Sequence, residues 1–216
     1  MIGIFIASSS RFSSVEWMTP YSIQKNSSQD YPIHVIRPES VGMEEHGCTG
    51  FTNVRYAVPE LCREYGYDFG IYLDVDMLVL GDIVELAGYA RRHKWVCLDD
   101  GSNEVSVICS TLKFPRKEKL HTFKKWELPR DFTPLIPKEW NVEDEIKPGM
   151  KLLHFTAMDH QPWFYEHPDH EVAKKYIDWY ASYHSRNRAE SDAGSNSVSQ
   201  RFKAAKVRMQ SLLQGR

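Results

Sequence analysis

The sequence has no long apolar run. Nowhere in its 216 residues do about 18 apolar residues follow one another, which excludes an ordinary transmembrane helix. The apolar start at residues 1–7 is short, no basic residue precedes it, and it runs into three serines. This pattern is typical of a first β-strand rather than a signal peptide. We therefore expect a cytoplasmic protein.

A strong charge of one sign and paired cysteines are also missing. The formal net charge is −2, so the chain has no general attraction for nucleic acid or for an anionic membrane. The cysteines are Cys48, Cys62, Cys97 and Cys109, and no two of them form a CxxC pair. This argues against a zinc ribbon and against a thioredoxin-like redox motif, and we expect reduced thiols.

Strand-like and helix-like segments alternate along the chain. Apolar, β-prone runs predict strands at 2–7, 31–36, 66–80, 95–98, 105–109 and 151–155. Helical spacing of apolar residues predicts helices at 52–65, with Pro59 as a kink or a restart, at 82–92 from an Asp cap, and at 171–183. Five prolines in 113–150 predict loops and short helices there. The alternation predicts an α/β domain with a mainly parallel central sheet and a ligand site at the carboxyl ends of its strands.

Two carboxylates interrupt the most apolar of these runs. Asp74 and Asp76 lie one residue apart within the segment 70–82. Burying a carboxylate costs several kcal/mol unless a partner compensates for it. Hard divalent cations prefer oxygen ligands and often lie between carboxylates and the phosphates of a substrate. The pattern predicts a metal–diphosphate site at the end of a buried strand.

Two blocks around these carboxylates resemble a known enzyme family. Residues 51–61 (FTNVRYAVPEL) with 71–86 (IYLDVDMLVLGDIVEL) resemble the core of the family 8 glycosyltransferases, which are glycogenin-like and bacterial galactosyltransferase-like enzymes. Residues 152–163 (LLHFTAMDHQPW) are similar to the family's later His-Phe-x-Gly…Lys-Pro-Trp block, and Trp140-Asn141 also fits the family pattern. The resemblance covers about residues 2–183. It implies a GT-A (Rossmann-like) fold with a DxD motif at a strand end.

The resemblance also implies a ligand set. Asp74, Asp76 and His154 would bind Mn²⁺ or Mg²⁺, and two carboxylates with one imidazole suit Mn²⁺ better than Zn²⁺. The donor would be a UDP-sugar. Residues expected to contact it are Ala7, Ser8, Arg55, Asp74, Val75, His160 and Gln161.

The chain departs from the family pattern at two positions. Ala157 replaces the family's glycine, and Gln161 replaces its phosphate-contacting lysine, for which His160 could substitute. The family's Asp-Gln block has no clear counterpart. No nucleophile stands out, and the candidates near the reaction centre are Asp99, Asp100, Asp131 and Asp159.

These observations predict a metal-dependent glycosyltransferase. It would move a sugar from a UDP-sugar to a hydroxyl of a glycan, glycolipid or glycoprotein, with retention of the anomeric configuration. One alternative is a metal-dependent nucleotidyltransferase or sugar-nucleotide hydrolase, but the loop 8–12 lacks the glycines that a nucleotidyltransferase needs. The other is a non-catalytic sugar-nucleotide-binding module of a larger chain.

The composition changes near residue 185. We expect a GT-A domain at 1–184, followed at 185–216 by a basic linker and an amphipathic helix. Apolar residues recur at helical spacing in 198–213, which predicts contact with a membrane surface or a partner. The alternatives are that this helix packs on its own domain, or that the segment is a linker to a further part of the protein.

Overall fold

The structure is a computed structural model, and it describes residues 1–45, 49–90, 95–98, 108–111, 132–158, 161–164 and 171–193. The chain divides into two compact units. The first comprises residues 1–143 and 147–154, and the second comprises 144–146 and the chain from Phe155 onward. Within the described ranges, every helix is too short or too polar to cross a lipid bilayer.

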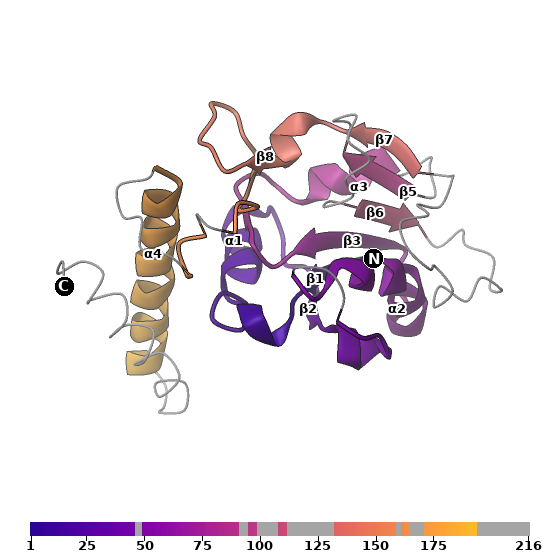
Figure 1. Ribbon diagram of the computed structural model, residues 1–216, viewed down its shortest axis with the longest axis horizontal. Coiled ribbons are helices and arrows are strands. Elements are labelled where there is room, and N and C mark those ends of the chain that lie inside the picture. The colour runs from indigo at the N-terminus through magenta and orange to yellow at the C-terminus, as the bar shows by residue number, and fades with distance from the viewer. Residues whose placement is uncertain are drawn as a thin grey trace. The chain divides into compact units, whose positions relative to one another are not determined.

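A six-stranded sheet forms the centre of the first unit (Figure 1), in the order β2-β1-β3-β6-β5-β7. Its strands are β1 (Ile2–Ala7), β2 (Ile33–Ile36), β3 (Phe69–Asp74), β5 (Trp95–Leu98), β6 (Ile108–Thr111) and β7 (Phe132–Ile136). β1 pairs in parallel with β2 and β3, and β5 pairs in parallel with β7. β6 runs antiparallel to both β3 and β5. The predicted α/β class with a mainly parallel sheet is confirmed.

The register of β1 aligns three strand ends at one edge of the sheet. Ala7, the last residue of β1, pairs with Ile36 at the end of β2 and with Asp74 at the end of β3. The interior of β1 and most of β3 are fully buried, as continuous apolar runs require in a parallel sheet. The carboxyl ends of these three strands, where α/β sheets bind ligands, therefore lie side by side at Ala7, Ile36 and Asp74.

The described residues of this unit form the α-helices α1 (Met18–Asn26), α2 (Val58–Tyr65) and α3 (Val84–Ala90). The segment predicted as one helix at 52–65 is a 3₁₀ helix, η3 (Thr52–Ala57), followed by α2. Pro59 lies in the first turn of α2, where its missing N–H costs nothing, so the predicted restart is confirmed. The Asp82 cap is also confirmed, because its Oδ1 accepts a hydrogen bond from the Val84 amide at 3.2 Å.

The strand predicted over 66–80 is wrong as a single element. β3 ends at Asp74, residues 75–76 form a turn, and β4 (Met77–Val79) continues in a second sheet of order β4-β9-β8. The Thr19 hydroxyl of α1 lies 2.8 Å from the carbonyl oxygen of Val75 and 2.7 Å from that of Met77. At the break between β3 and β4, the Thr19 hydroxyl therefore supplies a hydrogen bond to the backbone carbonyl oxygens.

The proline-rich segment also holds more strand than its composition predicts. β7 (Phe132–Ile136) contains Pro134, and β8 (Val142–Glu143) follows the 3₁₀ helix η5 (Lys138–Trp140). β7 lies at the edge of the large sheet, where a residue without an N–H leaves no interior ladder position empty. β9 (Leu152–His154) lies within the predicted strand 151–155.

In the second unit, α4 (Glu171–Ala193) begins where predicted and runs ten residues further. It continues through the expected domain boundary at 184/185, which itself stays a prediction. Phe155, Trp163 and Tyr176 form an aromatic cluster with ring centroids 5.2–6.4 Å apart. The amphipathic helix predicted at 198–213 lies outside the described residues.

Candidate metal centre

Two carboxylates meet where the chain passes from the large sheet to the small one. Asp74 is the last residue of β3 and Asp76 is the second residue of the turn that follows. Their side chains are almost fully buried, with residue exposures of 6% and 3%. The break in the strand therefore lets two carboxylates that are close in sequence approach the same point.

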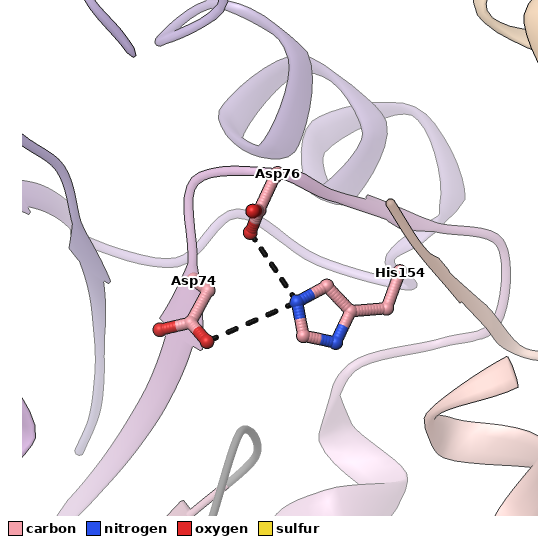
Figure 2. A group of neighbouring side chains, drawn as sticks. All are labelled: Asp74, Asp76 and His154. Atoms are coloured by element: carbon pink, nitrogen blue, oxygen red, sulfur yellow. Dashed lines mark ion pairs between the residues drawn. The ribbon is translucent and has the colours of Figure 1, made fainter. Parts of the chain in front are cut away.

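His154 reaches this point through strand pairing. β4 and β9 are antiparallel with Met77 opposite His154, so the residue that follows Asp76 fixes the position of the histidine. His154 Nε2 lies 3.3 Å from Asp76 Oδ1 and 3.9 Å from Asp74 Oδ2. Figure 2 shows one ring nitrogen of His154 facing both carboxylates. One ligand atom from each of the three residues lies within 4.8 Å of the others.

Burial and mutual charge shift the titration of this group. Burial raises the pKa of Asp74, and the charge of Asp76 adds to that rise, while Arg55 and His154 oppose it. Burial lowers the pKa of His154, but its hydrogen bond to Asp76 and the charges of both aspartates outweigh burial and leave the pKa above its ordinary value. Two carboxylates face one guanidinium and one imidazole here, so a proton or a cation among the three side chains is favoured.

Two further side chains hold the second oxygen of Asp74. The Tyr72 hydroxyl donates a hydrogen bond to Asp74 Oδ1 at 2.5 Å. The Arg55 guanidinium lies 3.8 Å from the same oxygen and over the Tyr72 ring, 5.2 Å from its centroid. Arg55 Nε also donates to the Thr52 carbonyl at 2.7 Å, which fixes the guanidinium beside Asp74. Oδ2 of Asp74 is thereby left facing His154.

Sequence reasoning assigned no role to Tyr72, although a signal was available. Residues i and i+2 of a strand point to the same face, so Tyr72 and Asp74 had to share one. The sequence indicates Asn141 only as part of the Trp140-Asn141 pair that fits the family pattern. Its Oδ1 lies 2.9 Å from His154 Nδ1, which leaves Nε2 on the side of the carboxylates.

The residues present fit a hard divalent cation. Two carboxylates and one imidazole are suitable ligands for Mn²⁺ or Mg²⁺, and all three are buried and close enough to share one ion. The imidazole has its second nitrogen in a hydrogen bond, as metal-ligating histidines almost always do.

The residues expected to hold the nucleoside lie at the same edge of the sheet. Ala7 pairs with Asp74, and its carbonyl oxygen accepts a hydrogen bond from the Val75 amide at 3.0 Å. Ser8 follows directly, is fully buried, and donates its hydroxyl to Glu16 at 2.8 Å. Arg37, the first residue after β2, holds the same carboxylate. Ala7, Ser8 and Val75 are thus gathered beside Asp74, and their contact with a donor stays a prediction.

The second block that resembles the family, residues 152–163, lies mainly in the second unit. Gln161 is buried and donates its Nε2 to the Phe155 carbonyl at 2.6 Å. Asp144, with a φ of 49°, accepts hydrogen bonds from the Thr156 hydroxyl and, at 2.9 Å, from the Ala157 amide. Both contacts stabilise the turn after β9. Phosphate binding by Gln161 stays a prediction, and the expected sites Asp99, Asp100, Asp131, Asp159 and His160 lie outside the described residues.

Solved structures with a similar fold are glycosyltransferases. An active-site mutant of LgtC matches with a TM-score of 0.62 and 12% identity, over 83% of this chain and 95% of that one. The galactosyltransferase LgtC in complex with donor and acceptor sugar analogs matches at 0.59 and 12%, with the same coverage. The glycosyltransferase GlyE of Streptococcus pneumoniae TIGR4 matches at 0.56 and 13%, over 83% of this chain and 60% of that one. No protein-family model and no curated protein matches the sequence.

Proposed function

We propose that this chain, which has the GT-A-like fold of these sugar transferases, is a metal-dependent glycosyltransferase. It transfers a sugar from a UDP-sugar to a hydroxyl of a glycan, glycolipid or glycoprotein. The observation that carries the proposal is the buried group of Asp74, Asp76 and His154 at the carboxyl edge of the sheet. The likeness to LgtC, whose complex holds donor and acceptor sugar analogs, supports the choice of reaction.

The three ligand residues would hold the cation through one carboxylate oxygen each and His154 Nε2. A divalent cation, when bound, supplies positive charge that stabilises the diphosphate leaving group of a sugar nucleotide. Tyr72 and Arg55 keep Asp74 in place from the other side. Because these contacts come from the protein's own side chains, the carboxylates would need little reorganisation when the donor enters.

Retention of the anomeric configuration is part of the proposal. Within the described part of the site, Asp74 contacts His154, Tyr72 and Arg55, and Asp76 contacts His154. These two carboxylates are placed to hold a cation rather than to attack a sugar. We propose that the acceptor hydroxyl attacks on the face from which the diphosphate leaves, with the leaving phosphate taking its proton. NMR of an early product tests this, and an inverted anomer would exclude it.

The first test is calorimetric titration of UDP into the protein with and without Mn²⁺. Wild type is compared with Asp76→Asn, which keeps the size of the side chain and removes its charge. We expect UDP binding that depends on Mn²⁺ and that the substitution abolishes. Equal binding with and without metal would contradict the role given to Asp74 and Asp76, and titrations with GDP and dTDP would then show whether another base is preferred.

A donor and acceptor panel separates the transferase from the other activities. Release of UDP that depends on an added acceptor supports glycosyl transfer. Release without any acceptor indicates a sugar-nucleotide hydrolase. Metal-dependent UDP binding without turnover of any donor indicates a binding module.

A further inference from the structure

One carboxylate ties together the ends of β1 and β2. Ser8 directly follows β1, Arg37 directly follows β2, and both bind Glu16, which precedes α1. The Ser8 hydroxyl donates to Glu16 Oε1 at 2.8 Å, and Arg37 donates to the same oxygen from Nη2 at 2.7 Å and from Nε at 3.1 Å. The Glu16 carboxylate therefore lies at the edge of the sheet that Ala7 and Asp74 mark.

The Glu16–Arg37 pair has hydrogen-bonding capacity left for a ligand. Oε1 of Glu16 accepts three hydrogen bonds, whereas Oε2 accepts one, from Arg37 Nη2 at 3.0 Å. Among the described residues, none accepts a hydrogen bond from Nη1 of Arg37. A carboxylate oxygen can accept two hydrogen bonds, and a guanidinium carries five N–H groups. The side chains are 23% exposed in Glu16 and 39% exposed in Arg37, so a ligand can reach one acceptor beside unused donors.

The order of the strands relates this pair to the candidate metal centre. β2, β1 and β3 are parallel neighbours, and ligands bind outside the carboxyl ends of such strands. On the other side of β3, β6 runs antiparallel. Neighbouring strands are about 4.8 Å apart, so Arg37 follows a strand that lies about 10 Å from the strand of Asp74. A nucleoside diphosphate with its phosphates at Asp74 and its ribose over β1 would bring its base to Glu16 and Arg37.

Uracil matches the hydrogen-bonding capacity that the pair has left. Proteins read unpaired bases through hydrogen bonds to the edges of the rings. The edge of uracil carries one N–H, at N3, between two carbonyl oxygens, so it requires an acceptor with a donor beside it. Oε2 of Glu16 is such an acceptor, and the guanidinium of Arg37 is such a donor.

The other bases match this pair less well. Cytosine has a bare ring nitrogen in place of N3–H, and a lone pair that faces a carboxylate forms no hydrogen bond and is repelled. Guanine has two adjacent N–H donors on this edge, and Oε2 of Glu16 has one lone pair left for them. The pair therefore favours uracil over cytosine, a base of the same size.

We propose that Glu16 and Arg37 select the base of the donor, with Glu16 accepting a hydrogen bond from N3–H of uracil and Arg37 donating one to an adjacent carbonyl oxygen. Ser8 and Arg37 hold the carboxylate so that Oε2 is left for the base. The assignment rests on the proposed function, because that function places the phosphates of the donor at the metal. It adds the choice of base, and it gives that choice to two residues that do not hold the metal.

Calorimetry at saturating Mn²⁺ with UDP, CDP and inorganic pyrophosphate tests the assignment. Pyrophosphate has no base, so it reports on the metal–diphosphate site alone. In wild type we expect UDP to bind about 10- to 100-fold more tightly than CDP, the range that a hydrogen bond to a charged group gives. Glu16→Gln keeps the size of the side chain, and its amide can donate to the bare nitrogen of cytosine. We expect Glu16→Gln to weaken UDP binding, to strengthen CDP binding and to leave pyrophosphate binding unchanged.

Two further variants complete the experiment. Arg37→Met removes the donors at similar length, and it should weaken UDP binding about tenfold relative to pyrophosphate. Glu64→Gln makes the same charge change as Glu16→Gln at an exposed position of α2, and it should leave all three affinities unchanged. Thermal denaturation verifies that each variant is folded before its affinities are compared.

The outcomes separate this assignment from the proposed function. An unchanged ratio of UDP to CDP affinity in Glu16→Gln would overturn the assignment, while metal-dependent UDP binding would leave the proposed function standing. Equal losses for UDP, CDP and pyrophosphate would also overturn it, because the pair would then only hold the ends of β1 and β2 together. If wild type bound none of the three ligands with Mn²⁺, the proposed function would fail and the assignment with it.

Discussion

His154 lies directly opposite Met77 in the antiparallel pairing of β4 with β9. Met77 directly follows Asp76. Its pairing with His154 therefore places the imidazole beside the carboxylates, one position along the ladder from Asp76. A slip of one residue would turn His154 to the other face of the small sheet. The register of this three-residue pairing therefore determines whether the three candidate ligands share one point.

The Thr19 hydroxyl supports the turn between the two sheets. Thr19 is fully buried, and its hydroxyl lies 2.8 Å from the Val75 carbonyl oxygen and 2.7 Å from that of Met77. We expect Thr19→Val to lower the free energy of unfolding by about 1–3 kcal/mol, because it leaves buried carbonyl groups without this donor. Urea denaturation measures the change. Thr19→Ser keeps the hydroxyl and should be clearly less destabilised, and equal losses in the two variants would contradict the explanation.

Tyr72 should affect the affinity for metal through Asp74. Tyr72→Phe removes only the hydroxyl that donates to Asp74 Oδ1. We expect Mn²⁺ binding to weaken by about tenfold in calorimetry, as for other residues that orient a ligand. Tyr65→Phe is the matched control, because Tyr65 is exposed at the end of α2 and its ring stacks on His34, away from the candidate ligands. Unchanged affinity in Tyr72→Phe would show that Arg55 alone suffices to hold Asp74.

Gly70 sets the distance between β3 and α2. A Cβ at this position would lie 2.5 Å from Cys62 Sγ and 2.6 Å from Val58 Cγ1. We expect Gly70→Ala to destabilise the protein by about 1–3 kcal/mol through overpacking. Gly88→Ala in α3 is the control, because nothing lies within 4 Å of its Cβ and alanine favours a helix by about 0.5–1 kcal/mol. Thermal denaturation should therefore shift in opposite directions for the two variants.

Cys62 should be chemically inert in the folded protein. Burial raises the pKa of its thiol to about 12, so the thiolate that reacts with alkylating reagents is scarce until the pH approaches that value. We expect iodoacetamide at pH 8 to leave Cys62 unmodified under native conditions and to modify it in urea. Peptide mass spectrometry separates Cys62 from the other three cysteines. Equal labelling in both conditions would show that α2 opens readily.

Much of the first unit could be predicted from the sequence because its signals are local. Apolar runs bounded by turns predicted β1, β2 and β9, and Pro59 and Asp82 marked the starts of helices. The break at Val75 could not be predicted, because β3 and β4 are both apolar and a turn between them leaves the pattern unchanged. β7 could not be predicted, because Pro134 argues against a strand unless that strand lies at the edge of a sheet. Which strand lies at an edge depends on the whole topology.

The candidate site, like the fold, could be predicted from the sequence only in part. Asp74, Asp76 and His154 were predicted as a ligand set, and the structure brings them together. The partners that orient them, Thr19, Tyr72 and Asn141, act through hydrogen bonds whose geometry no sequence pattern contains. Such contacts depend on distances of tenths of an ångström between strands that meet only after folding.

The turn at Val75 brings Asp76 beside His154, and this has a further consequence for how the protein unfolds. A cation shared by Asp76 and His154 would close a loop of about 80 residues, a contact whose formation carries a large entropic cost. Ion binding would raise stability in proportion to the logarithm of its concentration. Since β9 must separate from β4 before the ion can escape, a bound ion would act as a reversible crosslink that retards unfolding.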